Sequence, residues 1–435
     1  MRIDPLLKVL RSAEPGGAGI RAWSVYVTQG RRLSLGTKDC ETGSAHTPLT
    51  FSESLDASYL LVWKDGRISR GLLEKRQIVR DAEEALALAR TSAYDDPDAA
   101  QVRGPARFPE IALHDASVTT TIDGDIGPVE RRLEAIRERL LDNGFRIWSG
   151  SFSFNDAQAR LVTSRGLDAE GVGSTAGWYV SFEGEFGDGF RARAPDSYRE
   201  FEERLDRLAE TVRLLKKDVP PLPGGVCPVI LHPHVVEDFV MGTILHNLDG
   251  ASVAHGEGFF KKEQFASQHQ ALREDLTLRL DPLQPLKSGS YRFTTEGVPA
   301  TPCTYIHRGR LVSPILDLKY AKRLGLEPSS VPYSMDTLEL EASGTLSSEE
   351  AYEIASGGAL VLSVLGVHTQ DPSSGDFSLA APQTLKLGPA GPEGRIKTTI
   401  SGNLFEVLRS DALRLVRFEG EHTPALLFPC RLDPS

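Results

Sequence analysis

The chain has 435 residues, of which 40% are hydrophobic and 25% are charged, and its formal net charge is −11. This length allows two or three domains with substantial cores, whereas the acidic balance argues against a nucleic-acid partner, because phosphate neutralisation needs a basic surface. No apolar run approaches the ~18 residues of a membrane span, and the N-terminus lacks the apolar core of a signal peptide.

The cysteines are few and widely spread, at Cys40, Cys227, Cys303 and Cys430. This usage fits a reducing compartment better than a disulfide framework. We therefore expect a cytoplasmic protein with no membrane partner. A secreted chain with two disulfides is the alternative.

The first 75 residues combine a short helix with strand-like runs, and Asp65-Gly66 between two such runs predicts a hairpin. Beyond them, apolar residues recur at three- and four-residue steps in three stretches, which predicts amphipathic helices. These helices are expected over 77–94, 128–143 and 195–217.

Residues 145–190 predict successive strands, because apolar and polar residues alternate there between turn residues. The runs cover 146–154, 159–164 and 177–182. The glycine-rich segment from Gly171 to Gly177 precedes the last run and is interpreted as a turn.

The segment 220–225, Pro-Pro-Leu-Pro-Gly-Gly, is stiff and marks the best domain boundary. It separates an N-terminal α/β domain, 1–220, from a C-terminal β-rich domain, 225–435. In the latter, short strand-like runs predominate, at 227–231, 276–280, 291–294, 303–307, 337–341 and 359–365. A helix from Pro233 to about Asn247 and a capping box at Ser347 and Glu350 interrupt them. The predicted fold class is α+β, with long helices in the first half and an antiparallel, barrel-like sheet in the second.

Glycine, proline, serine and aspartate crowd the segment from Leu365 to Leu404, which is flanked by strand-like runs. This composition predicts a shaped loop on a β scaffold, where binding residues tend to lie.

His232-Pro-His234 lies between a predicted strand and a predicted helix, and two histidines at this place could bind a metal. No third ligand is evident nearby in the sequence. The favoured interpretation is a loop with solvated imidazoles.

His246-Asn247-Leu-Asp-Gly-Ala251 ends the predicted helix. A zinc peptidase needs two imidazoles on the metal and a carboxylate base. His246 could be one ligand, but the amide of Asn247 cannot act as a base and Ala251 supplies no ligand. A site made of His246, His255 and Glu257 is conceivable, although its spacing matches no standard motif. The sequence contains neither a Gly-x-Ser-x-Gly elbow nor a phosphate-binding loop.

Four segments of the second half carry a family resemblance. They are Gly225-Val-Cys-Pro-Val-Ile-Leu, Phe293-Thr-Thr-Glu296-Gly297-Val-Pro, Gly375-Asp376-Phe377-Ser378 and Gly402-Asn403-Leu404. By these segments the chain resembles the TldD/PmbA family, once called modulators of DNA gyrase, and most of all its TldE (PmbA) branch. It departs from the family pattern at Thr294, where an aspartate is usual.

In that family, the TldD-like subunit carries His-Glu-x-x-x-His and a later cysteine as zinc ligands, and the TldE-like subunit lacks them. Here His246-Asn247-x-x-x-Ala251 falls at the motif, and Glu419-Gly-Glu-His-Thr-Pro runs through the region where Cys-Gly-Lys is expected. The resemblance therefore implies a pseudoenzyme with no catalytic residues and no metal of its own.

The resemblance further implies a heterodimer with a TldD-like subunit, which holds the zinc, around a chamber where unfolded or extended peptides are cleaved. A homodimer is left open. This chain would complete the chamber and bind peptide, through candidates Glu296, Gly297, Gly375, Asp376, Phe377, Ser378 and Asn403. Two alternatives are a self-associating peptide-binding module without proteolysis, and a hydrolase with the relocated metal site at His246, His255 and Glu257.

Overall fold

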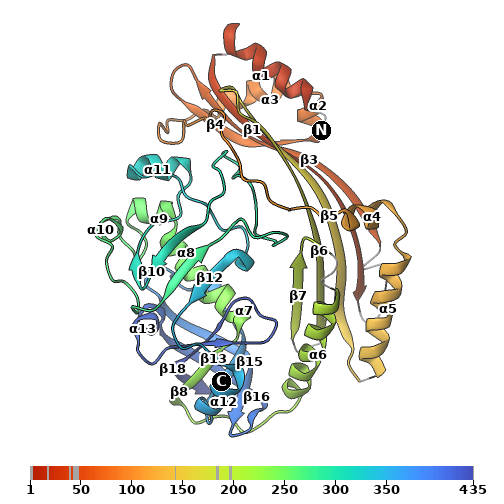
Figure 1. Cartoon of the computed structure of the whole chain (residues 1–435), viewed down its shortest axis with the longest axis vertical. Helices are drawn as coiled ribbons and strands as arrows, with labels where there is room; N and C mark the ends of the chain where they lie inside the picture. Colours follow the sequence, from red (N-terminus) through yellow and green to blue (C-terminus); the bar gives the residue numbers. More distant parts are fainter. Residues whose placement is uncertain are drawn as a thin grey trace.

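The structure is a computed structural model that describes residues 3–16, 19–38, 41–42, 49–142, 144–182, 186–194 and 198–434. Cys40 and the predicted helix start at 195–197 lie outside these residues. The N-terminal half is built on one long, curved sheet, and the C-terminal half lies beside its concave side (Figure 1). Among the described helices, none is long and apolar enough to cross a membrane.

The N-terminal sheet has the order β4-β3-β1-β5-β6-β7, with β2 paired to β1, and all of its pairings are antiparallel. Its strands are β1 (Ile20–Lys38), β2 (Glu41–Thr42), β3 (Thr50–Trp63), β4 (Ile68–Glu74), β5 (Ile147–Thr163), β6 (Asp168–Phe182) and β7 (Gly187–Ala192). The β3–β4 connection is the hairpin predicted at Asp65-Gly66, and Gly66 has the positive φ of 90° that this turn requires.

Two strand predictions in this sheet were wrong. The runs 146–154 and 159–164 form one continuous strand, β5, and the segment from Gly171 to Gly177 lies inside β6. Both segments stay in register through the supposed turn, where the side-chain amide of Asn155 donates a hydrogen bond of 3.0 Å to the hydroxyl of Thr175. Cross-strand pairing on both sides therefore outweighs the local turn preference of these residues.

Helices cover the convex face of this sheet and its lower end (Figure 1). They are α1 (Asp4–Gly16), α2 (Lys75–Val79), α3 (Ala82–Thr91), α4 (Ala116–Asp123), α5 (Gly127–Asp142) and α6 (Tyr198–Leu215). The stripe predicted for 128–143 is buried as expected. The helix predicted over 77–94 is instead two helices, since α2 ends at Val79 and α3 begins at Ala82. The carboxylate of Asp81 between them makes no capping hydrogen bond and instead accepts one of 2.7 Å from the guanidinium of Arg76.

The C-terminal half contains a closed barrel. Strands β8 (Gly225–Leu231), β14 (Ala359–Leu365), β15 (Asp376–Gly388), β16 (Gly391–Asn403) and β18 (Ala425–Pro434) pair in this order, and β18 pairs back to β8. The β8–β14 pairing is parallel and the other four are antiparallel. Strands β17 (Arg414–Arg417) and β13 (Leu346–Ser347) extend the sheet beside β18. The predicted α+β class with a barrel-like C-terminal sheet is confirmed.

A second, smaller sheet has the order β11-β10-β9-β12. Its strands are β9 (Thr277–Leu280), β10 (Cys303–His307), β11 (Arg310–Leu311) and β12 (Leu338–Glu341). The predicted strand at 291–294 is not one: Phe293 forms only an isolated bridge with Pro299, which closes a turn around Gly297.

The remaining helical segments are α7 (Pro233–Val235), the π-helix η2 (Val236–Met241), α8 (Gly242–Leu248), α9 (Gly250–His255), α10 (Lys262–Ala266), α11 (Leu318–Leu324), η3 (Met335–Thr337), α12 (Ser348–Ile354), η4 (Val367–Thr369) and α13 (Leu404–Arg409). The helix expected from Pro233 is thus α7, η2 and α8 in sequence. The capping box at Ser347 and Glu350 opens α12 as predicted.

The cores of the two halves are continuous around α6. Leu205, Leu208 and Val212 of this helix share one buried cluster with Trp178 of the N-terminal sheet and Leu385 of the barrel. The chain passes from α6 to β8 at the predicted boundary, 220–225, and the division into two domains stays a prediction. The described cysteines are free, and Cys227 lies opposite Cys430 across β8 and β18, although the two are far apart in sequence.

Candidate functional site

The amide of Asn247 connects three segments around α8. Its nitrogen donates hydrogen bonds to the carbonyl oxygens of Thr243, at 2.8 Å, and Pro372, at 2.7 Å. Its oxygen accepts a hydrogen bond from the backbone N–H of Phe259. The side chain is completely buried. At the position where a catalytic carboxylate is expected, the chain therefore has a neutral group whose donors and acceptor are already used.

The other two positions of the motif, His246 and Ala251, have different surroundings from Asn247. The imidazole of His246 is exposed and makes no hydrogen bond or ion pair with the described part of the chain. Ala251 lies in α9, which begins after the carboxylate of Asp249 accepts the backbone N–H groups of Ala251 and Ser252. Helix α8 ends at Leu248, so the motif is divided between two helices.

The loop 366–375 between β14 and β15 packs against this region, and its base is fixed by Gly375 and Asn403. Gly375 has a φ of +75°, and a Cβ there would lie 2.5 Å from the ring of Phe405. The amide nitrogen of Asn403 donates to the carbonyl oxygen of Ser374, at 3.1 Å, and to the carboxylate of Asp376, at 2.8 Å. Asn403 also caps α13. The shaped loop expected in this segment is present, and the rest of the segment is the long β15–β16 hairpin.

Phe377 and Ser378 complete the base of the loop. Phe377 is buried, and its ring contacts that of Phe239 with centroids 5.1 Å apart. The backbone N–H of Ser378 donates to the side-chain oxygen of Gln370 at 3.0 Å. Of the predicted binding residues in this loop, Asp376 is exposed, whereas Phe377 is a core residue.

A cavity of about 250 Å³ lies between the loop and α8, and both His246 and Asp376 line it. His368, Asp371 and Asp238 line it too. The structure therefore brings the degenerate motif together with the 375–378 loop and Asn403, which are far apart in sequence.

His255 and Glu257 do not join His246. The imidazole of His255 lies 3.1 Å from the guanidinium of Arg323, and its other nitrogen is 3.9 Å from the carboxylate of Glu257. In the described ranges, the only group of three potential ligands whose atoms lie within 4.8 Å of one another is a different one. The relocated metal site considered from the sequence is therefore not assembled.

Glu296 and Gly297 lie elsewhere, where the second half contacts the N-terminal sheet. The carboxylate of Glu296 accepts the backbone N–H of Leu318 at 2.8 Å and is 3.3 Å from the guanidinium of Arg70 on β4. Burial raises the pKa of Glu296 above its ordinary value. Gly297 packs against Leu161 and Leu167 of the N-terminal half. These two residues join the halves and do not line the cavity beside His246.

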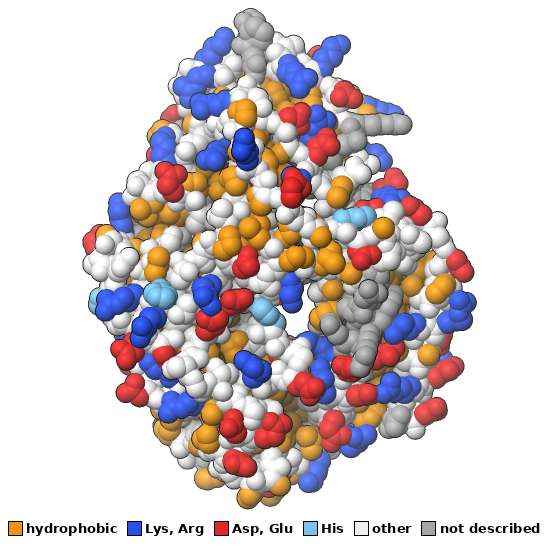
Figure 2. All heavy atoms as spheres, in the orientation of Figure 1, with side chains coloured by type: hydrophobic (Ala, Val, Ile, Leu, Met, Phe, Trp, Pro, Cys, Tyr) orange, Lys and Arg blue, Asp and Glu red, His pale blue; other side chains and the backbone are white. Residues whose placement is uncertain are grey.

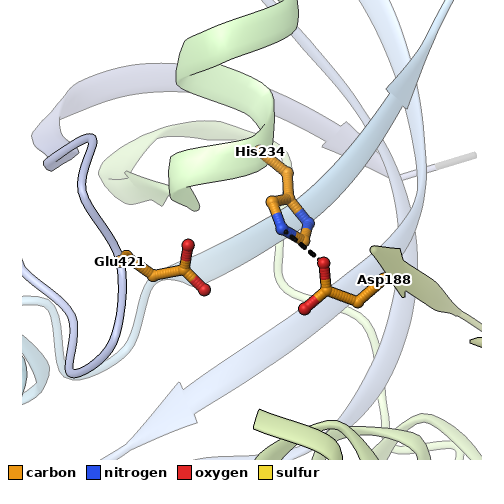
Figure 3. Close-up of side chains that lie close together, drawn as sticks. All are labelled: Asp188, His234 and Glu421. Atoms are coloured by element: carbon orange, nitrogen blue, oxygen red, sulfur yellow. Dashed lines mark ion pairs between the residues drawn. The ribbon is translucent and has the colours of Figure 1, made fainter. Parts of the chain in front are cut away.

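A second polar site, which we call the interface ion cluster, consists of Asp188 on β7, Arg204 on α6, His234 on α7 and Glu421 in the turn before β18. Figure 3 shows Asp188, His234 and Glu421. The imidazole of His234 lies 3.1 Å from the carboxylate of Asp188. His234 is mostly enclosed, with 23% of its side chain exposed. His232 beside it is surrounded by the rings of Phe186, His234 and Phe418. The prediction of solvated imidazoles at His232 and His234 was therefore wrong.

The guanidinium of Arg204 occupies the centre of the cluster. One of its nitrogens, Nη2, lies 3.0 Å from Asp188, 3.1 Å from the His234 ring nitrogen and 3.2 Å from Glu421. A metal ion bound by these three groups would need the place of Nη2. As the chain is folded, the cluster therefore holds its own cation and does not fit a zinc ion.

Charge neutralisation sets the protonation of the cluster. Burial alone would raise the pKa of Asp188, but hydrogen bonds from His234 and Arg204 lower it far below its ordinary value. Burial lowers the pKa of His234, but Asp188 and Glu421 outweigh this effect and raise it. Burial raises the pKa of Glu421. His232 has no such partner, and burial lowers its pKa strongly.

A cavity of about 380 Å³ adjoins this cluster, between β6 and β7 on one side and η2 and β14 on the other. Asp188, His234, Glu237 and Asp238 line it. A hollow between the N-terminal sheet and the C-terminal half is visible in the space-filling view (Figure 2). The only sequence signal for this site was His232-Pro-His234. The acidic partners of His234 are distant in sequence, since Asp188 lies 46 residues before it and Glu421 lies 187 residues after it.

Comparison with known proteins agrees with the architecture of the C-terminal half. Residues 224–427 match the PmbA/TldA metallopeptidase C-terminal domain, so the barrel half of the chain is a domain of this metallopeptidase-associated class. This match agrees with the resemblance to the TldD/PmbA family that the sequence motifs carry.

Two curated proteins and one solved structure describe the breadth of this similarity. A metalloprotease of Methanothermobacter thermautotrophicus is 26% identical over 227 residues, which are 49% of this chain and 48% of that protein. An uncharacterised protein of Methanocaldococcus jannaschii is 23% identical over 291 residues, 64% of this chain and 66% of that protein. The chain thus spans about half and about two thirds of these relatives. The structure of TldE from Thermococcus kodakarensis is similar in fold, with a TM-score of 0.77, 17% identity, and coverage of 99% of this chain and 100% of that one.

Proposed function

We propose that this chain is the non-catalytic, TldE-like subunit of a TldD/TldE-type zinc metallopeptidase that cleaves unfolded or extended peptides in an enclosed chamber. The observation that carries the proposal is the state of Asn247. Because its amide is buried and fully hydrogen-bonded, it can neither take a proton from water nor turn toward a metal. Ala251 offers no ligand atom, so the residues at the motif do not fit a zinc ion.

The zinc would then belong to the partner, a TldD-like chain with His-Glu-x-x-x-His. The name of the metalloprotease relative supports proteolysis as the activity of the complex. The role left to this chain is to form part of the chamber wall and to bind peptide.

Two features support the peptide-binding role. The loop 366–375 stands beside the cavity that contains His246 and Asp376, and its base is held rigidly by Asn403. In addition, β7 is an edge strand that pairs only with β6 and borders the cavity between the halves. An edge strand can hold an extended peptide by backbone hydrogen bonds without reading its sequence.

The experiment is reconstitution. The chain is mixed with a TldD-like chain encoded in the same genome, and the mixture is tested on a fluorogenic unstructured peptide and on the same peptide within a folded domain. We expect cleavage of the unstructured peptide by the mixture only, and none by either chain alone. A mixture that forms a stable complex but cleaves no unfolded peptide would refute the proposal.

Two variants of this chain test where the zinc is held. His246→Ala and His255→Ala should leave the zinc content of the complex unchanged, and His255→Ala, which lies outside the cavity beside His246, should also leave the cleavage rate unchanged. If either variant removes zinc from an otherwise intact complex, the chain holds the metal itself. Cleavage by this chain alone, with bound zinc, would favour the hydrolase alternative.

A further inference from the structure

A cavity of about 420 Å³, which we call the sheet pocket, lies where the concave face of the N-terminal sheet meets the turn at Glu296 and the start of α11. Its floor consists of two rows of paired residues on neighbouring strands, Ser24–Leu60–Arg70 and Tyr26–Ser58–Leu72. The opposite face of the same strands is buried beneath α1, α2 and α3. The sheet pocket has a volume typical of small-molecule sites and lies between two halves of the fold, where such sites often occur.

Three hydroxyl groups in the sheet pocket lack protein partners. Ser24, Tyr26 and Ser58 are half-buried, and their side chains make no hydrogen bond with the part of the chain that the structure describes. Burial raises the pKa of Tyr26, so its hydroxyl is a neutral donor near neutral pH. Small-molecule sites place a few polar groups in this way to orient a ligand. These three hydroxyls are therefore available to a polar ligand in the cavity.

Two guanidinium groups give the sheet pocket its charge. Arg103 lines it without an ion pair to the described residues. Arg70 makes only long contacts, 3.3 Å to the carboxylate of Glu296 and 3.4 Å to the carbonyl oxygen of Ala99. Guanidinium groups bind planar carboxylates through paired hydrogen bonds. With Glu296 beside them, the two arginines balance one negative charge better than the two charges of a phosphate.

We propose that the sheet pocket binds the free carboxylate of an amino acid or a peptide, with Arg103 as the main anchor, the hydroxyls along the polar backbone of the ligand, and Glu296 as acceptor for an ammonium or amide N–H group. The ligand is either a free amino acid or dipeptide, or the C-terminal residue of a longer chain. This inference does not depend on the proposed proteolytic role, because the pocket is remote from the cavity beside Asn247.

The test is isothermal titration of the full chain with four probes. They are alanyl-alanine, its C-terminal amide, an unstructured eight-residue peptide with a free C-terminus, and inorganic phosphate. We expect the free dipeptide to bind about tenfold or more tightly than its amide, because the amide loses the charge-assisted hydrogen bonds. Binding of the octapeptide as well assigns the pocket to chain ends, and its failure assigns it to free dipeptides or amino acids. Equal binding of acid and amide, tighter binding of inorganic phosphate, or no binding of any probe would overturn the inference.

Variants locate the binding. Arg103→Gln should weaken the free dipeptide about tenfold or more, whereas Arg21→Gln, an exposed arginine on the same strand β1 as Tyr26, should not. Tyr26→Phe removes one hydroxyl without changing charge or packing and should weaken binding by a smaller factor. Circular dichroism and the melting temperature verify folding of each variant. Unchanged affinity in both Arg103→Gln and Tyr26→Phe would show that binding occurs elsewhere.

Discussion

The replacement Asn247→Asp tests whether Asn247, at the degenerate motif, stabilises the fold by joining α8 to the loop 366–375. The two side chains are nearly identical in shape, but aspartate puts an oxygen where the amide nitrogen now donates to the carbonyls of Thr243 and Pro372. The bond from Phe259 N–H can persist, because the other oxygen remains an acceptor. The change therefore removes two donors and places a carboxylate against two carbonyl oxygens in a buried site.

The size and pH dependence of the effect follow from these contacts. The ionised aspartate leaves the Pro372 carbonyl unpaired, which costs about 1–3 kcal/mol. The protonated form keeps one O–H donor and can still bond one of the two carbonyl oxygens. The buried carboxylate has a raised pKa, and each unit of that rise adds about 1.4 kcal/mol of destabilisation at neutral pH. A group with a raised folded-state pKa keeps its stabilising proton below the unfolded value and loses it as the pH rises through the folded value. Asn247→Asp should therefore be more harmful at pH 7.5 than at pH 4.5.

The assay compares the melting temperatures of wild type, Asn247→Asp and Asn247→Ala at both pH values, together with hydrogen exchange of residues 366–376. Asn247→Ala removes these two bonds and the acceptor for Phe259 N–H as well, but it cannot titrate, so its loss should be the same at both pH values. Exchange in the loop should rise in both variants, because the tie to Pro372 is cut. An aspartate variant as stable as wild type at pH 7.5, or a loss that does not depend on pH, would refute the reasoning.

Three further outcomes are expected. Gly375→Ala should lower the melting temperature, since Gly375 combines a φ of +75° with a close contact to Phe405. Gly344→Ala, at a φ of +68° with open space around it, should lower the melting temperature less. Equal effects of the two variants in differential scanning calorimetry would contradict this. Arg204→Ala should let the interface ion cluster bind zinc, which atomic absorption after dialysis would detect; a zinc-free variant that melts normally would show that three ligands are not presented. The stability difference between wild type and His234→Asn should be larger at pH 6 than at pH 9. Because the pKa of His234 is raised in the folded state, the imidazolium stabilises the fold fully below the ordinary histidine pKa, and this stabilisation is lost as the pH rises through the folded-state pKa. A difference in melting temperature that is the same at both pH values would argue against the ion pair.

The sequence predicted the fold best where a local pattern agrees with tertiary packing. The stripe of α5 and the turn at Asp65-Gly66 were found because the same residues determine both the local structure and the burial. The break at Asp81 was missed, because the buried positions Ile78, Ala82 and Ala85 keep a helical spacing across it. The strand through Gly171 to Gly177 was missed, because cross-strand partners determine it rather than a local pattern. The short strand-like runs predicted a barrel-like sheet, but no local pattern could give the strands that close it, since the closing pair is long-range.

The candidate site was predicted in part for a similar reason. The loop at Gly375 and the motif at His246 were both identified, but only the fold shows that the amide of Asn247 joins them through Pro372. The interface ion cluster was missed, because Arg204 and Glu421 carry no signal that distinguishes them from other charged residues of the chain. Glu296 was predicted as a peptide-binding candidate, and its position beside Arg70 associates it with the sheet pocket.

The closure of the barrel between β8 and β18 has a consequence for biosynthesis. Strand β8 leaves the ribosome roughly 200 residues before the partner that covers its second edge, and contacts of such high sequence separation form late in folding. During that interval the growing chain exposes an apolar strand edge, which is a template for aggregation. A chain truncated before Ala425 would retain that open edge permanently, and we expect it to be found in inclusion bodies.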